Sequence, residues 1–268
     1  MKKKNKLCNA FTLTLSALAF AGCNDFLDTM PDNRAQVDSE QKVQSILVSA
    51  YIDHEPITVA ELISDNVDDF GENNPNTERW YDDTFAWKDE IEDANQSLNS
   101  FWESAFVSIA SANQALQGIE DLGGATTSTL KECKAEALLC RAYNHFMLAS
   151  MFCKHYSSSA TNDLGLPYIE HPETELNPQH ERGTLAELYE KIDRDLQEAL
   201  PMVGDSYYTV PKYHFNTKAA YAFACRFYLY CEKWEEALKY ANLCLGSQAK
   251  TMLRDWKSMA SMTQQRDA

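Results

Sequence analysis

The sequence has few basic residues and lacks the common short motifs of cofactor binding and catalysis. Its 268 residues include 24 Lys and Arg against 40 Asp and Glu, a formal net charge of −16. Such a surface repels phosphate backbones and no basic stripe offsets it, which argues against a nucleic-acid partner. No G-x-G-x-x-G or P-loop pattern for nucleotides and no G-x-S-x-G nucleophile elbow is present. Nothing in these patterns indicates a nucleotide-dependent enzyme or a serine hydrolase.

Cysteine spacing typical of metal sites is also missing. None of the eight cysteines forms a C-x-x-C pair, whereas zinc sites need closely spaced Cys and His ligands. Apolar residues make up 44% of the chain, so a core can form without a disulfide framework. We therefore expect no metal and no cofactor, and buried free thiols in helices. The thiols concerned are Cys133, Cys140, Cys153, Cys225, Cys231 and Cys244.

The apolar run near the N-terminus is too short to span a membrane. It extends from Ala10 to Ala21, about a dozen residues, whereas a spanning helix needs ~20. A basic head precedes it, formed by Lys2, Lys3, Lys4 and Lys6. A basic head followed by a short apolar stretch is typical of a secretory signal.

A cysteine stands at the end of this signal. Phe20-Ala21-Gly22-Cys23 resembles a bacterial lipoprotein box, in which small residues admit the type II signal peptidase and the cysteine carries the lipid. Acyl chains on Cys23 would hold the chain at a membrane surface. We predict a lipoprotein signal peptide over residues 1–22 and a lipidated tether over 23–37. An ordinary secreted protein cut nearby is the alternative.

Helical periodicity predominates after the tether, and no alternating strand pattern exceeds a few residues. The predicted helix N-caps are Asp38, Thr129, Thr184 and Asn216. The first three are followed three residues later by Gln or Glu, which is the capping-box spacing. The mature chain is therefore predicted to be mostly α-helical.

The last predicted helices carry a repeat signature. Residues 131–200 look like the same helix pair with a long insertion between its helices. We predict an all-α fold of tetratricopeptide-like stacked helix pairs with long irregular loops over 38–250. The signature falls at tetratricopeptide positions of a roughly 34-residue unit, on Tyr221, Ala224, Cys225, Tyr228, Ala237, Ala241 and Cys244.

Residues 64–94 lose the helical period. Gly71, Pro75 and four Asn interrupt them, while Trp80, Tyr81 and Trp87 lie among acidic residues. We predict a long loop that carries aromatic side chains. Loops longer than about 12–15 residues inside a domain are usually functional or disordered.

Six motifs stand in order over residues 20–246. They are the lipobox with Asn24-Asp25-Phe26-Leu27-Asp28, Trp102 with Ala112-Asn113 and Ile119, Arg141-Ala142 with His145-Phe146 and Phe152, Leu164-Gly165-Leu166-Pro167-Tyr168-Ile169, Arg182-Gly183-Thr184 with the helix after it, and the Ala219-to-Ala241 repeat. Together they are far more specific than any one alone, and in this order they resemble the N-terminal half of the SusD/RagB family of nutrient-uptake lipoproteins.

The resemblance implies a function at the cell surface. Members of this family sit on the outer membrane through a lipid, bind an oligosaccharide or peptide, and pass it to a TonB-dependent barrel. They are not enzymes. Family members are usually about twice as long as this chain, so the resemblance implies that the remainder of the family domain is missing after the partial segment 251–268. We expect Leu253, Trp256 and Met259 to fold back there as one partial helix.

The 64–94 loop is the predicted ligand site. Flat aromatic rings stack on the apolar face of a pyranose, while amides and carboxylates bind its hydroxyls. Trp80, Tyr81 and Trp87, with Asn74 and Asp82, provide these groups on one loop. The alternative for each tryptophan is that it packs the loop onto the helical core.

Two further readings of the chain remain open. Tetratricopeptide grooves often bind peptides, so a protein-interaction scaffold at the membrane is possible. A secreted glycoside hydrolase is less favoured, because nothing marks a catalytic pair among the loop's acidic residues. Asn113 and His145 are expected to be hydrogen-bonded within the core rather than to bind a ligand.

Overall fold

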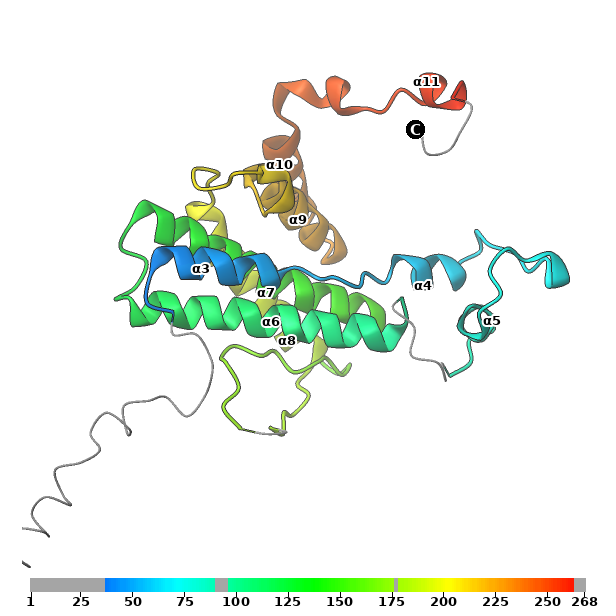
Figure 1. The fold of residues 1–268 in the computed structure, drawn as a ribbon, viewed down its shortest axis with the longest axis horizontal. Helices are drawn as coiled ribbons and strands as arrows, with labels where there is room; N and C mark the ends of the chain where they lie inside the picture. The colour runs from blue at the N-terminus through cyan, green and yellow to red at the C-terminus, as the bar shows by residue number, and fades with distance from the viewer. Residues whose placement is uncertain (1–36, 90–95, 176–177, 263–268) are drawn as a thin grey trace, which may run out of the picture. The chain divides into compact units, whose positions relative to one another are not determined.

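The computed structural model describes residues 37–89, 96–175 and 178–262, and these residues form helices and loops with no β-strand. The predicted all-α class is confirmed (Figure 1). The predicted signal peptide and Cys23 lie outside the described residues. The α-helices are α3 (Glu40–Leu47), α4 (Ile57–Leu62), α5 (Arg79–Phe85), α6 (Leu98–Asp121), α7 (Ser128–Phe152), α8 (Leu185–Ala199), α9 (Thr217–Tyr230), α10 (Trp234–Leu245) and α11 (Trp256–Ala260). Short 3₁₀ turns cover Val48–Ala50, Gly71–Asn73, Leu200–Met202, Pro211–Tyr213 and Gly246–Met252.

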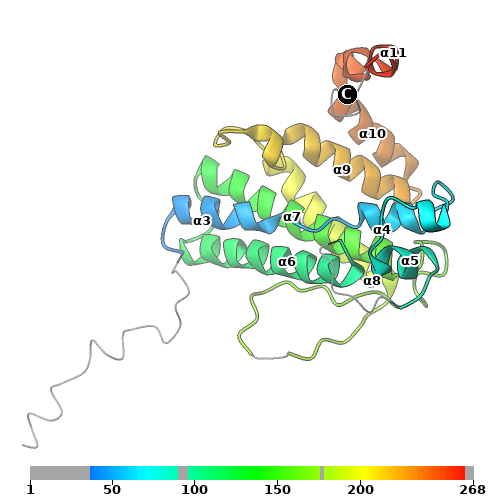
Figure 2. The ribbon, with the colours of Figure 1, turned by 45° about the vertical axis from the view of Figure 1, so that its right-hand side comes forward.

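Neighbouring long helices pack in pairs, as the repeat signature predicts. Helix α7 packs against α6 on one side and α8 on the other, and α9 packs against α10 (Figure 2). Small residues permit the close approach, since Ala135, Ala142 and Ala149 of α7 are all buried. The stacked pairs therefore agree with the tetratricopeptide-like arrangement.

Two of the predicted N-caps are correct and two are displaced by one or two residues. Thr184 forms the complete capping box with Glu187, and the Asn216 side chain accepts the Ala219 amide at 3.0 Å. Helix α3 is capped by Ser39 instead of Asp38, because Lys42 Nζ binds the Asp38 carboxylate at 2.9 Å.

The second displacement occurs at the start of α7. Helix α7 begins after Thr127, whose hydroxyl oxygen accepts the Leu130 amide at 3.1 Å. That hydroxyl also donates to Glu40 at 2.6 Å. A tertiary contact with α3 thus favours Thr127 over the predicted Thr129.

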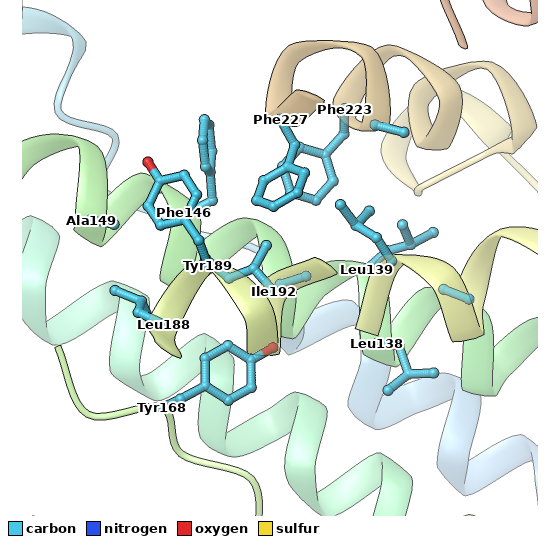
Figure 3. Packing of buried hydrophobic residues seen from close by; sticks show 14 of the residues in the cluster. Leu138, Leu139, Phe146, Ala149, Tyr168, Leu188, Tyr189, Ile192, Phe223 and Phe227 are labelled. Atoms are coloured by element: carbon cyan, nitrogen blue, oxygen red, sulfur yellow. The ribbon is translucent and has the colours of Figure 1, made fainter. Parts of the chain in front are cut away.

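Aromatic rings from α7, α8 and α9 pack together in the larger of the two buried hydrophobic clusters. The Phe146 ring on α7 lies 6.3 Å from Tyr189 on α8 and 5.7 Å from Phe223 on α9, measured between centroids. Phe227 packs against the same ring at 6.0 Å, and Figure 3 shows these side chains facing one another. Burying such rings contributes about 1.5–3 kcal/mol each, so this cluster joins α7, α8 and α9.

A buried ion pair ties the long 157–183 insertion to the helices. Arg141 on α7 donates to both carboxylate oxygens of Asp195 on α8, at 2.6 and 3.0 Å. The Tyr168 hydroxyl donates to the same carboxylate at 2.5 Å. Arg141 Nη1 also donates to the Glu170 carbonyl at 2.9 Å. Burial lowers the pKa of Arg141, but the hydrogen bonds and charge of Asp195 outweigh it, so the net shift is upward.

Asn113 and His145 complete this network and bear out their predicted core roles. The Asn113 side chain donates to the Ile169 carbonyl at 2.9 Å and accepts from Arg141 at 3.0 Å. His145 accepts the Ile169 amide at Nε2, 3.1 Å away, so its Nδ1–H donates to the Arg141 carbonyl at 2.8 Å. The imidazole is therefore neutral, and burial lowers the pKa of His145 to about 3.

Two regions differ from the sequence prediction. The segment expected to be one long loop from residue 64 contains a 3₁₀ turn and helix α5, while residues 90–95 lie outside the described ranges. Helix α11 does form, but Leu253 and Trp256 stay 77% and 69% exposed, so they do not fold back onto the repeat.

Of the six described cysteines, all are free thiols, but only Cys133 and Cys140 are fully buried.

We predict that breaking the buried ion pair costs far more than breaking a surface pair. Arg141→Ala leaves the Asp195 carboxylate buried and unpaired, which should lower the free energy of unfolding by about 3–5 kcal/mol. Lys134→Ala on α7 removes the partly exposed partner of Glu198 on α8 and should cost at most about 1 kcal/mol. Urea denaturation of the two variants measures both values, and similar losses would contradict the assigned role.

We also predict that His145 makes the protein less stable in acid. Below pH 6.5 the unfolded chain binds a proton at this histidine that the folded chain rejects, so stability falls as pH drops toward 3. The slope reaches about 1.4 kcal/mol per pH unit. His145→Gln should flatten the dependence of Tm on pH between 4 and 6.5, whereas His180→Gln at an exposed site should not. An unchanged slope in His145→Gln would refute the assignment.

Candidate functional site

A pocket of about 700 Å³ lies within the predicted ligand loop. Its wall combines aromatic, carboxylate and amide side chains from α5 and from the turn that precedes it. The aromatic residues are Phe70, Tyr81 and Phe85; the acids are Asp65, Asp68, Asp69 and Asp82; the amides are Asn66, Asn74 and Asn76. Leu62, Val67 and Pro75 complete the lining.

Hydrogen bonds between Asp69 and Asn74 hold the turn in shape. The Asp69 carboxylate accepts the Gly71 amide at 2.7 Å and the Asn74 side-chain amide at 2.6 Å. The Asn74 oxygen in turn accepts the Phe70 amide at 2.8 Å. The Gly71 and Asn74 hydrogen bonds keep the pKa of Asp69 below its usual value. Asn74 therefore holds the turn in place as well as lining the pocket.

Three of the five predicted ligand residues line this pocket. Asn74, Tyr81 and Asp82 are in its wall. Trp80 is only 5% exposed and packs its ring on Tyr81, with centroids 4.1 Å apart. Trp87 is 75% exposed, has a positive φ of 56°, and is not a lining residue.

Sequence reasoning missed how Phe70 and Phe85 contribute. Tyr81 and Phe85 are four residues apart on α5, so they share one helix face. That spacing was the available signal, but Gly71, Pro75 and the asparagines led to a loop prediction for the whole segment.

The pocket is negatively charged. Its lining contains four aspartates and no lysine or arginine. Within the described residues, no group of three or more His, Cys, Asp or Glu is placed to hold a metal ion. The arrangement can therefore stack a ring and accept hydroxyl hydrogens, and it disfavours anionic ligands.

Comparison with known proteins identifies the family. A family model described as "starch-binding associating with outer membrane" matches residues 25–229, which include the whole pocket. The chain belongs to the SusD-like family. The motif-based resemblance is thus confirmed. Comparison with curated protein sequences finds no match.

Solved SusD-like structures share the fold of this chain. A SusD superfamily protein of Bacteroides vulgatus has a TM-score of 0.64 and 20% identity, over 85% of this chain and 51% of its own. One from Bacteroides thetaiotaomicron has a TM-score of 0.61 and 19% identity, over 85% and 50%. A laminarin-binding SusD-like protein has a TM-score of 0.56 and 20% identity, over 78% and 44%. The SusD-like chain described here spans about half the length of these relatives.

Within the described ranges, no helix is both long and apolar enough to cross a membrane.

We predict that the two tryptophans of the site behave differently on truncation. Trp80→Ala removes a buried ring and should lower stability by about 3–5 kcal/mol, because the void cannot fill completely. Trp87→Ala removes an exposed ring and should change stability by less than about 0.5 kcal/mol. Thermal melting of both variants tests this, and an equal loss would show that Trp87 also packs against the fold.

Proposed function

We propose that this chain is a cell-surface lipoprotein that binds a nutrient oligosaccharide and delivers it, uncleaved, to a TonB-dependent outer-membrane transporter. The observation that carries the proposal is the aromatic, acid and amide pocket inside the segment matched by the starch-binding family model. The laminarin-binding relative supports a glycan as the ligand class. Lipid attachment at Cys23 would hold the chain at the outer membrane, in line with the family description.

Binding would use the faces of the rings and the oxygens beside them. Phe70 is 66% exposed and Phe85 is 36% exposed, so both rings can present a face to the apolar side of a pyranose. Asp82 and Asn76 would accept or donate hydrogen bonds to the ring hydroxyls. Because all four charged lining residues are acids, we propose that the ligand is neutral.

A binding role fits these carboxylates better than hydrolysis. A glycosidase needs one carboxylic acid whose pKa is raised so that it can protonate the leaving oxygen. Asp69 has a lowered pKa, and its Oδ1 accepts both hydrogen bonds that hold the turn. Asp69 is therefore unsuited to the role of the acid, which favours recognition without cleavage.

One specific observation favours the alternative function, a protein-interaction scaffold at the membrane. Helix α10 exposes Trp234, Leu238 and Leu243 at 60%, 63% and 49%, which is an apolar surface suited to protein contact. A nutrient receptor that meets a barrel also needs such contacts, so this surface is compatible with the main proposal.

We predict that neutral oligosaccharides bind at the 62–85 pocket. Isothermal titration with maltoheptaose and laminarihexaose should give saturable binding. Tyr81→Ala and Phe70→Ala should weaken it on the order of 30-fold, the loss typical of a central aromatic anchor. Trp234→Ala, which truncates an equally exposed ring on α10, is the matched control and should bind like the parent chain.

Because the Tyr81 ring packs on Trp80, Tyr81→Ala can also disturb the fold. In that case Phe70→Ala tests whether the pocket binds the oligosaccharide. Parent-like affinity in the Phe70 variant would move the site away from this pocket. Absence of heat with every neutral oligosaccharide, from a chain that melts cooperatively, would argue against the proposed ligand class.

A further inference from the structure

A second group of aromatic residues lies on the segment that joins α8 to α9. This strap, residues 203–216, carries Tyr207, Tyr208, Tyr213, His214 and Phe215. Two carboxylates of α7 anchor it. Glu132 accepts the Ser206 amide at 3.0 Å and its hydroxyl at 2.8 Å.

The second anchor is the fully buried Glu136. It accepts hydrogen bonds from Tyr207 and from His214 Nδ1, the latter at 2.7 Å. The Tyr51 hydroxyl donates to Glu136 as well and accepts the Phe215 amide at 2.7 Å. Glu136 is thus saturated by its own chain, and its role is to fix the aromatic rings of the strap rather than to bind a ligand.

The fixed rings form the floor of a cavity of about 410 Å³. Tyr143 of α7 meets Phe215 at 5.6 Å and Phe223 of α9 at 5.2 Å between centroids. Three charged residues, Glu55, Lys212 and Arg226, also line the cavity. Burial raises the pKa of Tyr143. The charge of Glu55 adds to this rise and the charge of Arg226 opposes it, because both charges lie near the tyrosine hydroxyl.

An adjoining cavity of about 540 Å³ extends this space toward α3. Both cavities are lined by Tyr51, Tyr213 and His214, so they meet at these three residues. Tyr213 is 77% exposed, which leaves its ring free to stack on a ligand. The α3 side contributes Gln41, Gln44 and Ser45, which can bind hydroxyl groups. We refer to the two cavities together as the strap groove.

The strap groove has the opposite charge character to the 62–85 pocket. The chain has 24 basic residues against 40 acidic ones, yet Lys212 and Arg226 both line the 410 Å³ cavity. Among the described residues, neither side chain has an ion-pair or hydrogen-bond partner. Glu55 is the sole acidic residue that lines the two cavities of the strap groove, because Glu136 lies behind the rings.

We propose that the strap groove is a second glycan site, which binds a sugar residue bearing a carboxylate, of the uronic acid class. This inference rests on the proposed glycan-binding function. Arg226 would pair with the carboxylate, because a planar guanidinium matches carboxylate geometry. Tyr213 stacks on the pyranose, and the α3 amides bind the next residue of the glycan.

Titration with trigalacturonate and with its fully methyl-esterified form tests the proposal. The free acid should bind, and the ester should bind at least about tenfold more weakly, since a charged hydrogen bond is lost. Arg226→Gln and Tyr213→Ala should each weaken the free acid about tenfold or more. Lys218→Gln, an exposed cation on the same helix, is the control and should have no effect. Raising the salt concentration from 0.05 to 0.5 M should weaken the acid and leave the ester unchanged.

Each outcome separates this inference from the main proposal. Maltoheptaose binding should be weakened in Tyr81→Ala and unchanged in Arg226→Gln. If maltoheptaose binds but trigalacturonate does not, the second site is refuted while the first stands. If trigalacturonate binding depends on Tyr81 and not on Arg226, the acid occupies the first pocket and the inference is wrong. If a peptide with a free carboxylate binds through Arg226 in place of the sugar, the assigned ligand class is wrong.

Discussion

The ion pair between Arg141 and Asp195 is the constraint on which the arrangement of the helices and of the long insertion depends. It joins α7 to α8 in the interior, where two charges are costly unless every hydrogen bond is made. Tyr168 and the Glu170 carbonyl supply the missing partners from the insertion. Residues 168–170 therefore cannot leave their place without exposing a buried charge pair. This part of the insertion completes the polar interior of the helices, and it also buries Leu166, Tyr168 and Ile169 in the main hydrophobic cluster.

Much of the fold could be predicted from the sequence, because helix periodicity and capping are local. The Thr184 capping box and the Asn216 cap need only residues within one turn, and both are correct. The α3 cap moved because Lys42 takes the Asp38 carboxylate. The α7 cap moved because Thr127 meets Glu40, which is 87 positions earlier in the chain. Contacts of that range leave no trace in a short window of sequence. Helix α5 was mistaken for loop for a local reason, since Gly71, Pro75 and the asparagines before it masked the spacing of Tyr81 and Phe85.

The candidate site was predicted in composition but not in geometry. Residue types suited to sugar binding were visible in the 64–94 segment, and Asn74, Tyr81 and Asp82 do line one pocket. Which aromatic ring faces outward is decided by folding: Trp80 is buried against Tyr81, while Phe70 and Phe85 turn toward the cavity. The strap groove was invisible beforehand, because it brings together side chains from three distant parts of the chain around the buried Glu136.

The free thiols have a consequence for where the protein can fold. Burial raises the pKa of Cys133 to about 12 and raises that of Cys140 as well, so neither forms an appreciable amount of thiolate at neutral pH. Disulfide exchange proceeds through the thiolate, so these two sulfurs are chemically quiet once the core has closed. Cys133 and Cys140 thus tolerate both reducing and oxidising surroundings. Their exposure to oxidative mispairing is confined to the interval before α7 is enclosed by its neighbours, which makes prompt collapse of that helix a safeguard for these two thiols.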